Sequence, residues 1–515
     1  MGDTNHVKTP NPASFSVTDE EASGRMESAS VRARFWNRET LVNWFKAPSP
    51  NNFGINAAFW LYTFGIILSP VGLGGNRPIA FGLAQLALAA SCVLLAKERD
   101  FWRNIRFFKR LRVAMALFAL VICWAFIQTL PVVPESWTHP LWSETAATLG
   151  QSVTASISVA PEDAIKGLVR LVTYAIACAI AFVLLQDSRR ARRFLDMLWA
   201  TGVMICAYGL VVYLAGIQKI LWFDKWAYNE DLTSTFVNHN HFAIYAAMIL
   251  TCGVARLAQS WRELMRTKPA SFARALRDWL GREGLPQGFM IAMVLLCIVL
   301  SHSRAGLTLA LVGLGAWVLL FQVYLRAWRK VWLAGLGTIV VLAAVLVFAV
   351  HTSERFSVLF SDYSSLDRLK AYTIGWHALL DNPWLGYGLN GYEPEFRLYQ
   401  HDMRVEFNHA HNDWLESLLD LGVPMALALW AAIGLLLSGL AHGILNRRRF
   451  GLYPTLGLAA SVMALGHALV DFDLQIPGVV LTWLSLVGMG LAQSWSHAER
   501  DEEGEQSGLK PSLAG

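Results

Sequence analysis

The stretch from Phe407 to Gly422 concentrates side chains that could carry out acid–base chemistry. It contains His409, His411 and Asn412, followed by carboxylates at positions 413, 416 and 420. A histidine held near a reacting hydroxyl can act as a general base. The alternative interpretation is an interfacial histidine that packs only because its ring is amphipathic. The residues alone leave both interpretations of His411 open.

The local spacing suggests how these side chains would be arranged. A helix beginning near Asn408, a residue type common at the N-cap, would place His411, Leu415 and Leu418 on one face and the carboxylates on another. His409 would then point elsewhere, because His-x-His rings share one side only in a strand. No cysteine or carboxylate pattern completes a zinc site here, so we expect no metal.

Four arginines on the same expected side of the membrane lie at the ends of apolar blocks or in the polar segments beside them, and they could bind an anion. A guanidinium binds phosphate in a bidentate manner, and ionisable residues near membrane depth are functional candidates by default. The alternative is that they are solvated or extend to lipid phosphates without a catalytic role. The candidate anion-binding residues are Arg304, Arg368, Arg170 and Arg77.

Two further polar segments interrupt apolar sequence on that side. One runs from Thr235 to Phe242, and the other runs from His467 to Pro477. A short loop needs polar residues in any case, but three separated loops with His, Asn and Asp predict a polar cavity open to the outside. The candidate cavity residues are Asn412, His409, Asn238, Asn240, His467, Asp471 and Asp473.

Composition places the chain in a membrane. Of 515 residues, 55% are hydrophobic and only 16% are charged, which is too apolar for a soluble protein of this length. The six cysteines all fall in apolar blocks, so neither a disulfide framework nor a zinc site is expected. The formal charge of +5 is modest, and we expect no nucleic-acid partner. No cleavable signal peptide is recognisable in the polar first 50 residues.

Apolar blocks of about 20 residues predict an all-α polytopic membrane protein with about 12 transmembrane helices. A hairpin with Arg304 at its tip is expected between residues 288 and 324. Loops that would be internal carry 24 basic and six acidic residues, so both termini should be cytoplasmic. The predicted spans are 57–73, 78–96, 113–133, 167–186, 195–216, 241–257, 288–302, 305–324, 332–350, 422–443, 452–470 and 477–495.

The spans divide the chain into five parts. We expect a cytoplasmic segment (1–56), nine transmembrane helices (57–350), a helical periplasmic subdomain (351–421), three more transmembrane helices (422–495) and a cytoplasmic tail (496–515). Within the subdomain, apolar spacing predicts a surface helix from Leu366 to Asp381.

Several motifs together resemble the O-antigen ligase family and its exopolysaccharide polymerase relatives. His411-Asn412, nine residues and then Gly422 match that family's His-Asn-x9-Gly signature. Ser303-Arg304-Ala-Gly, the Thr-Phe-x-Asn-x-Asn segment at 235–240, Asp367-Arg368 and the His-x-Leu-Val-Asp-Phe-Asp segment at 467–473 follow the family's order. The likeness covers roughly residues 200–480. Two positions depart from the ligase pattern: Met425, and Asn229-Glu230-Asp231 where ligases tend to carry an arginine.

The resemblance implies a GT-C-like fold and an inverting glycosyltransferase that uses neither metal nor cofactor. Its donor would be an oligosaccharide on undecaprenyl diphosphate, and its site would face the periplasm from the bacterial inner membrane. His411 would be the base, with arginines on the diphosphate. The acceptor would be a growing glycan or lipid A core, and the departures favour polymerisation over ligation. A lipid or polysaccharide transporter is the alternative from another class, although no internal repeat supports it.

Overall fold

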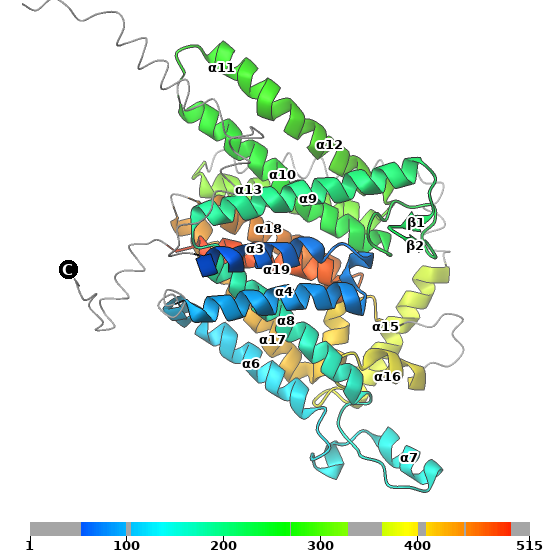
Figure 1. The fold of residues 1–515 in the computed structure, drawn as a ribbon. Helices are drawn as coiled ribbons and strands as arrows, with labels where there is room; N and C mark the ends of the chain where they lie inside the picture. The colour runs from blue at the N-terminus through cyan, green and yellow to red at the C-terminus, as the bar shows by residue number, and fades with distance from the viewer. Residues whose placement is uncertain are drawn as a thin grey trace, which may run out of the picture.

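The computed structural model describes residues 53–98, 105–267, 269–327, 363–399, 408–447 and 450–495, with side chains undescribed at 105–107 and 363–368. Most of these residues form helices, and the strands among them are one short antiparallel pair, β1 (Lys219–Ile220) and β2 (Phe223–Asp224). Most helices run side by side as a bundle (Figure 1). The prediction of an all-α fold is therefore confirmed.

Eight helices in the described part are long and apolar enough to cross a membrane, which makes the chain an integral membrane protein. Every predicted span on described residues coincides with a helix, whereas 332–350 lies outside them. The eleven described helices at these predicted spans are α3 (Phe53–Leu68), α4 (Pro78–Lys97), α6 (Arg112–Ile127), α8 (Pro161–Leu184), α9 (Ser188–Leu214), α10 (His239–Arg266), α12 (Leu285–Leu300), α13 (Arg304–Tyr324), α17 (Asp413–Asn446), α18 (Leu452–His467) and α19 (Pro477–Ala492).

Helix α10 lies at the centre of the bundle. It packs against α9, α12, α13, α18 and α19, and nearly all of its first half is buried. On the other side, α19 packs against α18 and α8, and α17 packs against α6. The central position of α10 fixes its N-terminus, where Asn240 and His241 lie, against the turn between α18 and α19.

The predicted hairpin at Arg304 is also present. Helix α12 ends at Leu300, and α13 begins at Arg304 after a Ser303 N-cap whose hydroxyl accepts a hydrogen bond from the Gly306 amide at 3.1 Å. Arg304 therefore occupies the first position of α13, at the tip of the hairpin, and it is exposed.

Some of the smaller elements lie together at one end of the bundle. The predicted surface helix is present as α15 (Tyr363–Asp381), followed by α16 (Tyr392–Tyr399), and both lie at the same end as β1 and β2 (Figure 1). The remaining elements are η2 (Leu73–Gly75), η3 (Ile105–Leu111), η4 (Glu135–Trp137), α7 (Pro140–Leu149), α11 (Phe272–Trp279), η5 (Leu280–Gly284) and η7 (Asp473–Gln475).

The start of α17 corrects one prediction. The helix begins at Asp413, and its N-cap is Asn412, whose side-chain oxygen accepts the Leu415 amide at 3.0 Å, not Asn408. His411 precedes the helix with a left-handed φ of 49°, so it does not share a helical face with Leu415 and Leu418. A helix cannot propagate backwards through that backbone conformation.

Gly422 interrupts α17 near its first third. Its φ of 73° and ψ of 158° lie in a region that is open essentially to glycine alone. A Cβ there would lie 2.5 Å from the carbonyl oxygen of Trp384. The break lets the Pro383–Gly388 loop pack directly on the α17 backbone, where the Tyr387 amide donates to the Leu419 carbonyl at 2.9 Å.

Candidate functional site

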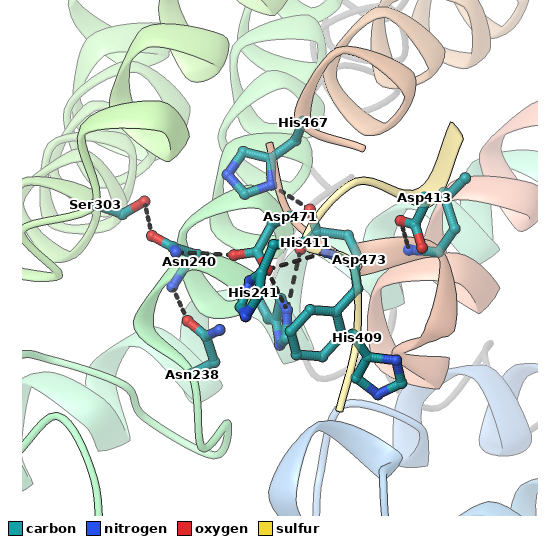
Figure 2. Close-up of polar contacts among 12 residues, drawn as sticks. Asn238, Asn240, His241, Ser303, His409, His411, Asp413, His467, Asp471 and Asp473 are labelled. Atoms are coloured by element: carbon teal, nitrogen blue, oxygen red, sulfur yellow. Dashed lines mark hydrogen bonds and ion pairs between the residues drawn. The ribbon is translucent and has the colours of Figure 1, made fainter. Parts of the chain in front are cut away.

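Three segments that are far apart in sequence meet at the end of the bundle that holds α15 and α16 (Figure 2). They are the N-terminus of α10, the residues just before α17, and the turn between α18 and α19. Capping fixes two of them: Asn238 accepts the Asn240 amide at 2.8 Å, and Asn412 caps α17. The Asp413 amide then donates to the Ala468 carbonyl at 2.8 Å, which joins the second segment to the third.

His411 and Asp471 form the central contact of the site. The His411 Nδ1 lies 3.0 Å from an Asp471 carboxylate oxygen. The carboxylate is 1% exposed and the imidazole is 18% exposed, so a substrate can contact the pair only at the imidazole. The Tyr372 hydroxyl of α15 also donates to the His411 backbone carbonyl at 2.9 Å. Because a carboxylate acceptor favours the tautomer with the proton on Nδ1, Nε2 carries the lone pair.

Asn240 connects this pair to the hairpin that carries Arg304. Its amide nitrogen donates to the second Asp471 oxygen at 2.8 Å, and its carbonyl oxygen accepts from the Ser303 hydroxyl at 2.6 Å (Figure 2). The network runs from His411 through Asp471 and Asn240 to Ser303, the residue before Arg304. The first position of α13 is thereby tied to the position of the His411 ring.

Neighbouring imidazoles keep Asp471 ionised. Burial alone would raise the pKa of this carboxyl, but His241 and His411 outweigh it and hold the pKa well below its usual value. The His241 Nε2 lies 3.7 Å from Asp471 and 3.8 Å from Asp473, within ion-pair distance but beyond hydrogen-bond length. His467 Nδ1 contacts the other Asp473 oxygen. Two imidazoles therefore bracket Asp473 behind the central pair.

Phe472 packs against three imidazole rings. The His409 ring stacks on it at a centroid distance of 4.3 Å, and His411 and His241 meet its edge at 4.9 and 4.7 Å. The helix assumed for His409 is absent, because the backbone before Asp413 is non-helical. The two rings share Phe472 but turn to different carboxylates, His409 to Glu416 and His411 to Asp471.

His409 has its own carboxylate partner, which the sequence did not single out. Its Nδ1 lies 3.1 Å from Glu416, and the same carboxylate accepts from the Ala410 amide at 3.0 Å and the Gln475 side chain at 2.5 Å. Glu416 is almost fully buried. It holds the backbone just before His411, and its place one turn into the helix is the only signal that could have indicated this role.

Asp231 was also missed by the sequence analysis. Its carboxylate lies 2.8 Å from the His302 Nδ1 and 3.1 Å from the His239 Nδ1, and His239 also contacts the Ser301 carbonyl at 2.7 Å. These contacts hold the residues just before Asn240 against the hairpin turn. Asp231 belongs to the acidic segment that departs from the ligase pattern.

The four candidate arginines are placed differently. Arg304 follows Ser303 directly, and Arg170 of α8 approaches the Gln475 carbonyl at 3.4 Å, next to Glu416. Arg77 lies over the ring of Trp226 at 5.5 Å, so its described partner is outside the His411 cluster. Arg368 belongs to α15, but its side chain lies outside the described part.

A cavity of about 540 Å³ opens beside the site, between α6, α8, α17 and α19. Most of its wall is apolar. Polar side chains line it where α8, α17 and α19 begin: Arg170, Asn390, Asp413, Glu416, Ser417, Asp420 and Gln475. Glu416 is therefore shared between the His409 contact and the cavity wall.

The arrangement can accept a proton from a hydroxyl and stabilise negative charge on a group that leaves nearby. A histidine whose tautomer is fixed by a buried carboxylate is suited to accept a proton from a hydroxyl through Nε2. An exposed arginine at the neighbouring helix start could stabilise negative charge on a departing group. These groups fit acyl, phosphoryl or glycosyl transfer to a hydroxyl, and geometry alone does not choose among these classes.

Comparison with known protein families favours one of these reaction classes. Residues 289–431, which include Arg304, His411 and Gly422, match the family model described as O-antigen ligase. No curated protein matches the chain. The chain is thus an integral membrane protein whose residues 289–431 are similar to the O-antigen ligase family.

Proposed function

We propose that the protein transfers a glycan from undecaprenyl diphosphate to a sugar hydroxyl, with His411 as the general base. The observation that carries this proposal is the His411–Asp471 pair, whose atoms lie 3.0 Å apart in the turn region between membrane helices. His411 Nε2 takes the proton of the acceptor hydroxyl. The hydroxyl oxygen then bonds to the anomeric carbon with inversion as the bond to the diphosphate breaks.

The leaving diphosphate needs positive charge nearby. In this proposal Arg304, assisted by Arg368 and Arg170, takes the place that a metal ion has in many other transferases. The hydrogen bonds through Asn240 and Ser303 support this role for Arg304, because they fix the position of the start of α13 relative to the His411 ring. Arg77 has the weakest support, since its described partner is Trp226.

The site is assigned to the periplasmic face of the inner membrane, with both termini in the cytoplasm. The basic residues of the alternate loops support that orientation. The location of α15 and α16 at the same end as His411 agrees with a periplasmic subdomain over the site (Figure 1). A donor held in the lipid would then reach the base from the membrane surface.

Polymerisation of repeat units is the preferred reaction, because Met425 and the acidic segment with Asp231 depart from the ligase pattern. Ligation to lipid A core is the second candidate, because the matching family model is described as O-antigen ligase. The two reactions differ only in the acceptor.

Gel profiles of surface polysaccharide from a strain that lacks the gene separate these reactions. Loss of a polymerase leaves single repeats, whereas loss of a ligase leaves long lipid-linked chains with no lipopolysaccharide carrying them. Complementation with the wild type should restore the normal profile, and His411→Gln at equal protein level should not. If the null strain has an unchanged profile, both candidates are wrong.

A further inference from the structure

The loop that joins α9 to α10 exposes aromatic side chains at the end of the bundle that holds α15 and α16 (Figure 1). Trp222, Trp226 and Tyr228 are all exposed, and Trp226 keeps 53% of its surface accessible. The loop backbone is nevertheless fixed, because β1 pairs with β2 and the Leu221 amide donates to the Tyr208 hydroxyl of α9 at 2.6 Å. The exposed rings are therefore held in place on the surface beside the candidate site.

Contacts with neighbouring side chains orient two of these rings. The Arg77 guanidinium lies over the Trp226 ring, 5.5 Å from its centroid, which makes this pairing a cation–π contact. Tyr228 stacks on the His239 ring at a centroid distance of 4.4 Å and an interplanar angle of 25°. His239 directly precedes Asn240, which belongs to the hydrogen-bond network of the site. The aromatic cluster thus begins one residue from that network.

A polar edge borders the rings. The Asp231 carboxylate lies between two imidazoles, with its oxygens 2.8 Å from His302 Nδ1 and 3.1 Å from His239 Nδ1. The His302 side chain is 54% exposed, so a ligand can contact its imidazole. His302 also lies two residues before Arg304, at the tip of the hairpin. The Asp231–His302 pair therefore connects the aromatic rings to the arginine assigned to the leaving diphosphate.

The backbone is strained at two residues of this cluster. Tyr228 and His302 have φ values of 55° and 56°, in the left-handed region that non-glycine residues seldom adopt. Hydrogen bonds hold the loop in this conformation: the Asp231 amide donates to the Tyr228 carbonyl at 3.0 Å, and the Lys225 ammonium donates to the Asp231 carbonyl at 2.6 Å. Backbone strain of this kind is concentrated at ligand-binding sites.

A sugar ring matches both parts of this surface. A pyranose has C–H groups on its faces and hydroxyl groups around its rim, so an indole or phenol ring packs on a face while a carboxylate and an imidazole bind the hydroxyls. Exposed tryptophans also occur where helices meet lipid head groups. A lipid phosphate would be repelled by the Asp231 carboxylate, whereas a sugar hydroxyl can donate to it. The cluster therefore suits a glycan better than a lipid head group.

We propose that Trp226, Tyr228, Asp231 and His302 form a subsite for the glycan of the lipid-linked donor. This inference rests on the proposed function, in which Arg304 binds the diphosphate of the donor. The glycan is attached directly to that diphosphate, so its first sugars lie within reach of His302, next to the tip of the hairpin. A sugar further along the glycan stacks on Trp226. A donor with a longer glycan should therefore bind more tightly.

Transfer from two defined donors tests the proposal. One is undecaprenyl diphosphate that carries a single sugar, and the other carries a complete repeat unit of the same surface polysaccharide. With full-length protein in lipid vesicles, we expect kcat/KM to be about tenfold higher for the longer donor, with the difference in KM. Trp226→Ala should reduce this ratio about fivefold, which is the contribution of one stacked ring. An unchanged ratio in this variant would overturn the proposal.

Further variants separate stacking from other effects. Trp226→Phe keeps an aromatic face and should retain most of the preference for the longer donor, and loss of the preference there would show that stacking does not hold the sugar. Trp261→Ala is the matched control, because this exposed tryptophan lies near the other end of α10 and should keep the wild-type ratio. His302→Asn tests the polar edge, since asparagine adopts a left-handed backbone but lacks the imidazole. The ratio should fall in this variant, and an unchanged ratio would contradict the role of His302.

Two further measurements identify which glycan is bound and separate this inference from the proposed reaction. If Trp226→Ala raises the KM of the acceptor and leaves that of the donor unchanged, the assignment to the donor is wrong. The free repeat-unit oligosaccharide has no diphosphate and cannot be transferred, so its binding to the full-length protein is followed by NMR titration. It should bind Trp226→Ala about fivefold more weakly than the wild type. If this difference is present but neither donor is used, the proposed reaction is wrong and the glycan subsite stands, whereas equal binding to both proteins would overturn the subsite.

Discussion

The His411 imidazole and the Asp471 carboxylate lie 3.0 Å apart although 60 residues separate them in the chain. The contact joins the residue before α17 to the turn after α18. It fixes the histidine tautomer and positions the base, so changes to either residue should affect transfer more than folding.

Asp471→Asn should reduce the rate of glycan transfer by about 100-fold or more, because the amide cannot hold the imidazole tautomer or stabilise its protonated form. Transfer is measured with purified protein in lipid vesicles. Asp224→Asn is the control, since Asp224 is an exposed carboxylate paired with Lys219. Equal activity of the two variants would show that Asp471 does not orient the base.

The depressed pKa of Asp471 predicts how stability changes in acid. A carboxyl whose pKa is lower in the folded state contributes stability that is present above its unfolded pKa, about 3.9, and lost as pH falls through the folded value. The gap in unfolding midpoint between the wild type and Asp471→Asn should therefore shrink as pH falls from about 5 to 3. A gap that widens over this range would contradict the assigned direction.

Gly422→Ala should destabilise the protein by about 1–3 kcal/mol, since alanine does not adopt the backbone angles found there. The added Cβ would also meet the Trp384 carbonyl oxygen at 2.5 Å. The unfolding midpoint in detergent measures the effect. Gly434→Ala is the control within the same helix: nothing lies within 4 Å of its Cβ position, so it should be neutral or slightly stabilising.

Arg304→Lys keeps the positive charge but loses the bidentate fork, so transfer should fall by about tenfold with protein level unchanged. Arg326→Lys, at the other end of α13, is the matched control. If Arg304→Lys keeps full activity in the vesicle assay, this arginine only extends to lipid phosphates and does not bind the leaving diphosphate.

The sequence predicted the helices well because apolar blocks of membrane-spanning length have few alternative structures. It also selected most of the residues around Asp471, since polar side chains between apolar blocks must lie at a membrane surface or in a cavity. The start of α17 was misplaced because Asn408 and Asn412 are equally suitable caps by residue type. In the structure the cap is Asn412, because its side chain accepts the Leu415 amide and the left-handed backbone at His411 prevents an earlier helix start.

Pairing was harder to predict than location. Asp471 and Asp473 are two residues apart, and only the packing of α17 against α18 and η7 decides which of them meets His411. The contacts of Glu416 with His409 and Gln475 depend on the same packing. The cavity left no signal in the sequence, because an apolar side chain that lines it looks the same as one that faces lipid.

The most direct test of the account is transfer from a defined undecaprenyl diphosphate oligosaccharide by reconstituted His411→Gln protein. His442→Gln is the control, because His442 is exposed near the opposite end of α17 and contacts only Asn446 among its described hydrogen-bond partners. The account predicts that His411→Gln binds the donor but transfers glycan about 100-fold or more slowly than the wild type, while His442→Gln is unaffected. Wild-type transfer rates in His411→Gln would contradict it.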